Sequence, residues 1–219
     1  MLSDNLIQKL FDTQDHSRMI GCLADNGTTL PLALQSRLTQ PIAAAGLGLR
    51  RLVELTYGPT PLSRDMTAAL LDGQQACGSF VSNSDRDPLA TAAAVAGLAA
   101  VLREHYGMSE GRPDLADAMD RAMASLSAMQ MEDGLFCHGD DRTIEDRALT
   151  SAFVLFLLAR LPRFREAIRF ADLMTWFEER ADRLDDVTLE LYHMARLDDP
   201  ARQPVMADAR LAGMAGMAA

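Results

Sequence analysis

The fold is decided by two related stretches of sequence. The first reads QQACGSF at residues 74–80 and then DPLATAA at 87–93. The second reads QMEDGLF at 130–136 and then DRALTSA at 146–152. The two glutamines lie 56 residues apart and the two aspartates 59, which leaves a three-residue insertion in the second copy. Self-similarity of this kind is typical of repeat architectures.

Each copy encodes the end of one helix and the start of the next. Gly78 and Gly134 are expected to take the left-handed conformation that ends a helix. Asp87 and Asp146 are expected to be the N-caps of the following helices. Those following helices are apolar on nearly every side, whereas the preceding ones are amphipathic. The repeat therefore predicts outer, half-exposed helices that alternate with inner, buried ones.

Helical periodicity continues on both sides of the repeat, and alternating β-branched runs are nearly absent. Glycine and proline separate the periodic segments. We expect eight helices, at residues 3–23, 34–55, 63–76, 88–105, 113–129, 147–160, 164–181 and 186–196. The predicted fold is all-α: helical hairpin repeats form an abbreviated α/α toroid or arc over residues 1–198. Residues 199–219, rich in Ala, Met and Gly, are expected to form a C-terminal tail.

The composition excludes several functional classes. The net charge of −10 predicts that the chain does not bind nucleic acid, because an acidic surface repels phosphate backbones. The longest apolar runs fall short of the roughly 20 residues that a transmembrane helix needs. The first residues lack the basic and apolar regions of a secretory signal. The three cysteines form no Cys-x-x-Cys pair, so we expect reduced thiols in a bacterial-type cytoplasm.

The turn Gln-x-x-x-Gly-x-aromatic, followed by an Asp-capped helix rich in Thr and Ala, resembles the QW-type repeat of terpenoid cyclases. It is similar as well to the repeat of protein prenyltransferase β subunits, and both families belong to the α/α toroid superfamily. The resemblance covers residues 63–160, with Phe80 and Phe136 where the cyclases usually carry Trp. It implies two rings of helices around an apolar funnel. The catalytic motifs are not matched: EDRALT at 145–150 does not fit Asp-x-Asp-Asp-Thr-Ala, and the zinc-binding Asp-x-Cys pair is absent.

Matching positions of the two copies supply the candidate ligand-binding residues. They are Asp87, Thr91, Asp146 and Thr150. Two carboxylates at the mouth of a funnel could act as an acid/base pair, or could hold a diphosphate through Mg²⁺. N-capping alone explains both aspartates as well.

The loop that precedes the second apolar helix is the most acidic of the chain. Its CHGDD run at 137–141 contains the candidate metal ligands His138, Asp140 and Asp141, and Glu145 is a further candidate acid. Ligands this close in sequence rarely reach one ion together, and an exposed polar loop explains the run as well. We therefore predict no metal site from this loop.

Three functions fit these observations. In the first, a toroid-family protein with weak or no catalytic activity holds an apolar, isoprenoid-like ligand in its funnel, with Mg²⁺ only if a diphosphate is bound. In the second, a non-enzymatic helical scaffold binds a protein partner or forms a homodimer. In the third, an α/α barrel acts on carbohydrate with paired carboxylates, Asp140 or Asp141 together with Glu145 or Asp146. The aromatic content of 5% weakens the third function and argues against carbocation chemistry.

Overall fold

The computed structural model describes residues 37–38, 40–55, 59–82, 85–103, 112–139 and 143–197 of the chain. Within these ranges the fold is all-α, with one small two-stranded ladder. The helices are α4 (Pro41–Leu55), α5 (Pro61–Gly73), α6 (Pro88–Val101), α7 (Pro113–Ala128), α8 (Ile144–Leu158), α9 (Pro162–Ala167), α10 (Phe170–Arg180) and α11 (Asp186–Leu197). A 3₁₀ turn, η2, covers Ala181–Arg183, and the antiparallel strands are β1 (Val81–Ser82) and β2 (Asp85–Arg86). None of the helices in these ranges is long and apolar enough to cross a membrane.

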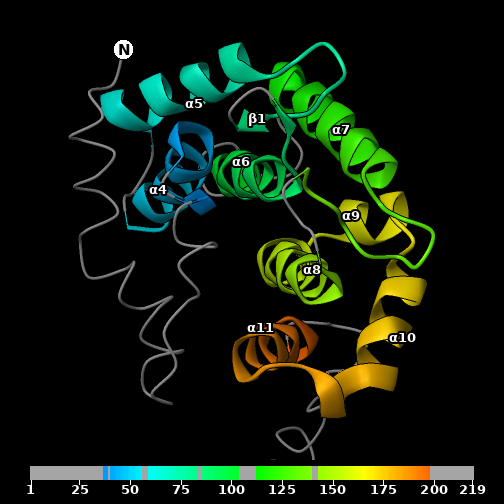
Figure 1. The fold of residues 1–219 in the computed structure, drawn as a ribbon. Coiled ribbons are helices and arrows are strands. Elements are labelled where there is room, and N and C mark those ends of the chain that lie inside the picture. The colour runs from blue at the N-terminus through cyan, green and yellow to red at the C-terminus, as the bar shows by residue number, and fades with distance from the viewer. Residues whose placement is uncertain are drawn as a thin grey trace, which may run out of the picture.

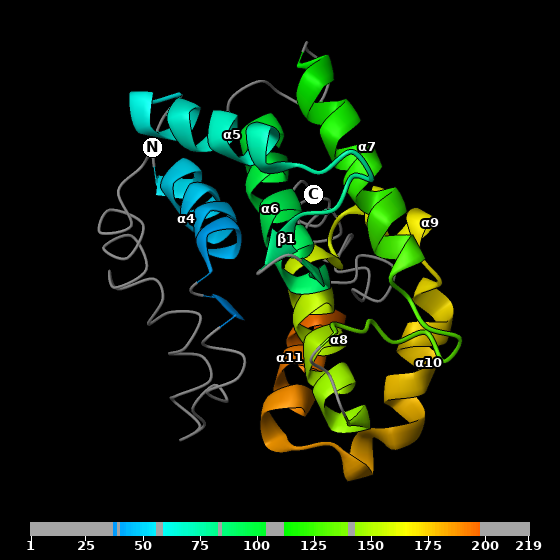
Figure 2. The same ribbon diagram turned by 45° about the horizontal axis from the view of Figure 1, so that its top comes forward.

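The helices form two rows (Figure 1). Helices α4, α6, α8 and α11 lie side by side in an inner row, and α5, α7, α9 and α10 pass along its outer side (Figures 1 and 2). The chain alternates between the rows from α4 to α11, except that α9 and α10 follow one another in the outer row (Figure 1). The predicted alternation of inner and outer helices is confirmed.

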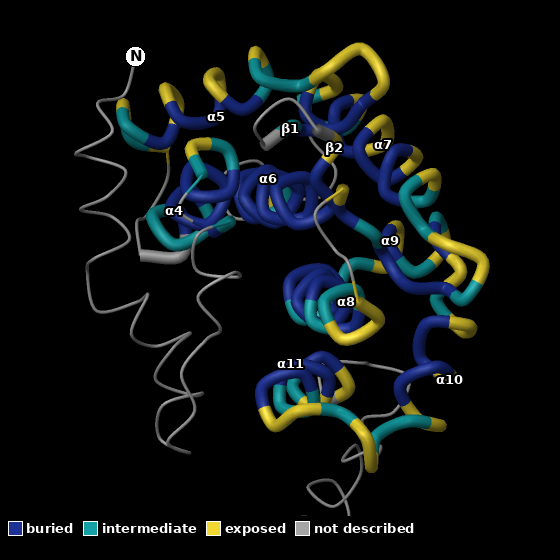
Figure 3. The backbone as a smooth tube through the Cα atoms, in the orientation of Figure 1, coloured by how far each residue is buried: buried dark blue, intermediate teal, exposed yellow. Residues whose placement is uncertain are grey.

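Burial follows the same two rows (Figure 3). Thirteen of the 14 residues of α6 are buried, and the fourteenth, Ala99, is half-buried. By contrast, α7 buries only one face, through residues such as Leu115, Ala118 and Leu126. This contrast arises from the sequence. A helix that is apolar all round must be covered on every side, whereas an amphipathic helix packs only its apolar face against its neighbours.

Glycines bring two inner helices into backbone contact. A Cβ added at Gly46 of α4 would lie 2.3 Å from the carbonyl oxygen of Ala93 on α6. A Cβ added at Gly97 of α6 would lie 2.5 Å from the carbonyl oxygen of Gly46. Both distances are far below van der Waals contact, so only glycine permits this approach. The inner row is therefore packed solid between α4 and α6.

The turn of each repeat copy has the geometry that the sequence predicts. Gly78 and Gly134 have φ angles of 85° and 86°, in the left-handed region. The Gly78 N–H donates to the carbonyl of Gln75 at 2.8 Å, and the Gly134 N–H donates to that of Met131 at 2.9 Å. The two turns thus share the glycine conformation and the hydrogen bond that the glycine N–H donates.

The repeated glutamine fastens each turn to the next outer helix. Gln74 Nε2 donates to the carbonyls of Gly78, at 3.0 Å, and of Ala118 on α7, at 2.7 Å. Gln130 Nε2 donates to the Gly134 carbonyl at 2.7 Å, while its Oε1 accepts from the Arg169 N–H at 2.9 Å. The glutamine is therefore a clamp between one hairpin and the next, a role that the sequence pattern alone does not reveal.

The Gln130 clamp also explains why one expected helix is two. The sequence predicts a continuous helix at 164–181, but the structure has α9 and α10, separated at Ile168 and Arg169. Ile168 is extended, with ψ of 169°. Because the Arg169 N–H donates to the Gln130 side chain, it is not used in a helical ladder.

The register of the second copy differs from the expected one. Helix α8 begins at Ile144 with Thr143 as its N-cap, and Asp146 is the third helical residue, in a capping box with Thr143. The expectation that Asp146 is the N-cap is wrong, because the Thr143 hydroxyl accepts from the Asp146 N–H at 3.1 Å. The expected helix at 3–23 and the expected tail at 199–219 lie outside the described residues.

Candidate functional site

Asp87 is a fully buried carboxylate at the start of an apolar helix. It is the N-cap of α6, and its Oδ1 accepts from the Leu89 N–H at 2.8 Å. Oδ1 also accepts from Arg37 Nη2 at 2.9 Å, which forms an ion pair. The second carboxylate oxygen, Oδ2, accepts no hydrogen bond from any residue that the structure describes. A buried carboxylate oxygen without a donor is costly, so the site calls for a functional explanation.

Arg37 connects Asp87 to the neighbouring inner helix. Its Nη2 binds Asp87, and its Nη1 donates to Thr150 Oγ1 on α8 at 2.8 Å. The arginine side chain is 16% exposed, whereas Thr150 is buried. The N-terminus of α6 and the middle of α8 are thereby joined by one guanidinium, whose planar donors can serve two acceptors at once.

His138 faces the carboxylate oxygen that Arg37 leaves open. Its Nε2 lies 3.9 Å from Asp87 Oδ2, and its side chain is 6% exposed. That separation is too long for a direct hydrogen bond. Two residues earlier, the Phe136 N–H donates to Ser151 Oγ on α8 at 2.8 Å, which joins this loop to α8. We call Arg37, Asp87, His138 and Thr150 the Asp87 cluster.

The cluster lies at a position that favours an anion. Asp87 stands at the N-terminal end of α6, where the helix dipole and the free N–H groups stabilise negative charge. The Arg37 guanidinium adds a positive charge 2.9 Å away. Two unlike charges are thus paired within an apolar interior, where breaking a pair costs far more than it does at a surface.

The hydroxyl of Thr91 is used by the fold. It donates to the Asp87 carbonyl at 2.8 Å and accepts from the Phe80 N–H at 3.1 Å. Ser151 Oγ accepts from the Phe136 N–H in the same way, so Ser151 and not Thr150 is the structural counterpart of Thr91. Because of this one-residue shift, the Thr150 hydroxyl does not bind the Phe136 N–H and accepts instead from Arg37 Nη1.

The other candidate acids do not join the cluster. The carboxylate of Asp146 accepts from the Thr143 N–H at 3.2 Å, within its own capping box, and Glu145 is exposed. Asp140 and Asp141 lie outside the described residues. Within the described ranges, His, Cys, Asp and Glu side chains form no group of three that could hold a metal ion. Asp87 and Asp146 therefore do not fit a shared magnesium–diphosphate site, because each carboxylate has its own partner within the fold.

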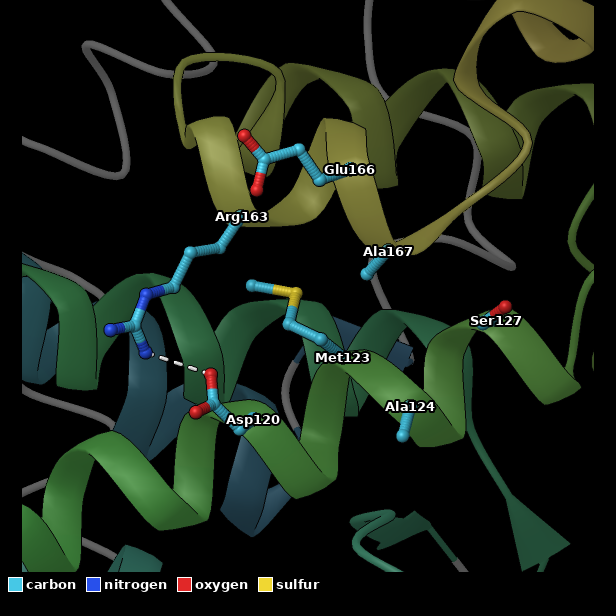
Figure 4. A pocket seen from close by; sticks show the side chains of 7 residues that line it. All are labelled: Asp120, Met123, Ala124, Ser127, Arg163, Glu166 and Ala167. Atoms are coloured by element: carbon cyan, nitrogen blue, oxygen red, sulfur yellow. Dashed lines mark hydrogen bonds and ion pairs between the residues drawn. The ribbon is translucent and has the colours of Figure 1, made fainter.

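A separate groove of about 630 Å³ lies on the outer row, between α7 and α9 (Figure 4). Its lining consists of Asp120, Met123, Ala124 and Ser127 from α7 and Arg163, Glu166 and Ala167 from α9. Asp120 and Arg163 pair across it at 2.7 Å, although both side chains are more than half exposed. Exposed pairs of this kind contribute little, so the groove lacks the buried polar chemistry of the Asp87 cluster.

Sequence reasoning named Asp87, Thr150 and His138 but missed Arg37. Three of the four cluster residues were candidates, although His138 was considered as a metal ligand. Arg37 lies 50 residues before Asp87 and 113 before Thr150, outside both copies of the repeat. Its partners are set by tertiary packing, and no local pattern marks it.

The Asp87 cluster has the composition of a binding site. A carboxylate, a guanidinium, an imidazole and a hydroxyl converge between apolar helices, and a few convergent polar groups in apolar surroundings are typical of ligand sites. Comparison of the chain with protein-family models, with curated protein sequences and with solved structures gives no match.

Proposed function

We propose that this protein is an α/α toroid-type protein that binds an apolar, isoprenoid-like ligand and that the Asp87 cluster holds the ligand's polar group. Any catalytic activity is weak or absent in this proposal. The observation that carries it is Asp87 Oδ2, a buried carboxylate oxygen that accepts no hydrogen bond from the described residues. An unsatisfied buried acceptor costs about 1–3 kcal/mol, and more when it is charged. A ligand that donates a hydrogen bond to this oxygen therefore gains binding free energy.

The apolar part of the ligand is proposed to lie along the inner row. Leu149 and Phe156 are half-buried and lie two turns apart on one face of α8, next to Thr150. Ala99, about three turns beyond the N-cap of α6, and Leu102, directly after that helix, are half-buried as well. Half-exposed apolar side chains that extend along the helices away from a buried polar cluster are what a ligand with an apolar body and one polar end requires.

The α/α toroid supplies the structural context of the proposal. Its support is the QW-like repeat together with the alternation of inner and outer helices (Figure 1). The tight contact of α4 with α6 limits where a ligand can lie. We therefore place it along α6 and α8, and not between α4 and α6.

Equilibrium dialysis of the full chain against radiolabelled farnesol tests the proposal. We expect saturable binding that Asp87→Asn weakens about tenfold or more, since a hydrogen bond to a charged group contributes about 1.5–3 kcal/mol. Asp185→Asn is the matched control. Asp185 also starts a helix, because its Oδ1 accepts from the Val187 and Thr188 N–H groups, and it lies outside the cluster.

Equal losses in Asp87→Asn and Asp185→Asn would mean that the change acts through helix capping and would contradict the proposed site. Absence of binding by the unmodified chain would contradict the proposed function itself. In that case, sedimentation of a stable dimer would favour the interaction scaffold.

A further inference from the structure

We infer that the polar group of the ligand is an uncharged hydroxyl that bridges Asp87 and His138, and that a diphosphate is rejected at this site. This inference rests on the proposed function and names the chemistry of the group that the cluster accepts. It follows from three properties of the cluster: the distance between two buried polar atoms, the charge already paired there, and the three donors that already bind Asp87 and Thr150.

The distance between Asp87 Oδ2 and His138 Nε2 suits one oxygen atom that bridges them from the side. Oδ2 and Nε2 are 3.9 Å apart. An oxygen placed about 2.7 Å from the carboxylate and about 2.9 Å from the imidazole nitrogen satisfies both distances, with an angle of roughly 90° at that oxygen. A hydroxyl has one O–H donor and two acceptor lone pairs, so it can donate to Oδ2 and accept from Nε2 at the same time.

The charge of the cluster disfavours an ionic group. Asp87 is already neutralised by Arg37 at 2.9 Å. A phosphate at the gap would lie against the open carboxylate oxygen, and like charges repel strongly away from water. An ammonium would add a second positive charge beside the guanidinium. A neutral donor is the only group that adds a hydrogen bond without adding an unpaired charge.

Three donors around Asp87 are already engaged, whereas the buried Arg37 Nε donates no hydrogen bond to the described residues. Arg37 is the cluster's permanent cation, and its Nη1 and Nη2 donate to Thr150 and Asp87. The N–H of Leu89, at the start of α6, donates to Asp87 Oδ1. The N-terminus of α6, which could otherwise attract a phosphate, is thus occupied by the chain's own carboxylate.

Three probes with the same carbon chain and different ends test this inference: farnesol, farnesene and farnesyl diphosphate. Competition against radiolabelled farnesol gives their relative affinities for the full chain, with and without Mg²⁺. We expect farnesol to bind about tenfold or more tightly than farnesene, and the diphosphate to bind more weakly than farnesol with or without Mg²⁺.

Two variants assign the preference to the bridge. Asp87→Asn retains a side chain that caps helices well, and we expect it to reduce the farnesol-to-farnesene affinity ratio about tenfold. His138→Leu should reduce the ratio about three- to tenfold, as for the loss of one side-chain hydrogen bond. It tests the bridge independently if Asp87→Asn fails to fold.

The outcomes separate the inference from the function on which it rests. Tighter binding of farnesyl diphosphate, or equal affinities for farnesol and farnesene, would overturn the hydroxyl bridge and leave the apolar ligand in place. An unchanged ratio in both variants would mean that a water molecule fills the gap, which also overturns the bridge. Failure of all three probes to bind would overturn the proposed function.

Discussion

Replacement of Gly46 by alanine tests the packing of the inner row. The added Cβ would lie 2.3, 2.4 and 2.6 Å from the Ala93 oxygen, the Ala93 carbonyl carbon and the Ala94 nitrogen of α6. All three are backbone atoms, so no side chain can rotate away and the two helices must separate. Overpacking of this kind typically costs about 1–3 kcal/mol.

A second effect has the opposite sign. Alanine is favoured over glycine inside a helix by about 1 kcal/mol. We expect the clash to prevail, because separating α4 from α6 also loosens the apolar contacts along both helices. The net result is a loss of up to about 2 kcal/mol in the free energy of unfolding, with about 2–4 °C in Tm for each kcal/mol.

Urea unfolding followed by circular dichroism measures this loss. Gly73→Ala is the control, because its Cβ would meet only the Ile42 Cδ1 atom, at 2.9 Å, which can move. The double variant Gly46→Ala/Gly97→Ala should lose less than the sum of its parts, since one separation of the helices relieves both clashes. If Gly46→Ala unfolds at the same or a higher urea concentration than the unmodified chain, the backbone contact between α4 and α6 is refuted.

Two further predictions concern the turns. Gln130→Ala removes the hydrogen bonds of this side chain to Gly134 and Arg169, so we expect the free energy of unfolding in urea to fall by about 1–3 kcal/mol. The control is Gln75→Ala, at an exposed residue next to the equivalent glutamine, and it should have little effect. Equal stability of the two variants would refute the role of the Gln130 side chain. The Ser79 hydroxyl, 3.1 Å from the Cys77 sulfur, lowers the pKa of this exposed thiol. A lowered pKa gives more thiolate at a given pH, so alkylation of Cys77 by iodoacetamide should begin at lower pH than in a free thiol, and Ser79→Ala should move the onset upward. An unchanged pH profile in Ser79→Ala would exclude the hydroxyl as the cause.

The repeat made the fold predictable because its information is local. Glycine at a left-handed position, a capping residue and an apolar helix act within a few residues of one another, so Gly78, Gly134 and α6 follow from the sequence. The break between α9 and α10 does not, because it depends on the side chain of Gln130, 39 residues earlier. The apolar periodicity of the sequence does not change at this break, so it does not reveal that the helix ends there.

The Asp87 cluster was predictable only in part, for the same reason. Asp87 starts an apolar helix, so its position was visible. Thr150 was chosen by aligning it with Thr91, an alignment that the hydrogen bond to Ser151 shows to be shifted by one residue. Arg37 reaches both across long stretches of chain, and its approach is set by how α4 packs against α6.

The shifted register has an evolutionary consequence. Once Thr91 and Ser151 are matched, the counterpart of Asp87 is Arg147, which pairs with Asp133 at 3.1 Å on its own turn. The two copies of the repeat thus carry opposite charges at one position. A duplicated hairpin lets one copy keep a local ion pair that secures its turn, while the other acquires a charge whose partner, Arg37, lies elsewhere in the chain. Divergence within a duplicated element can in this way create a buried polar site without the loss of either turn.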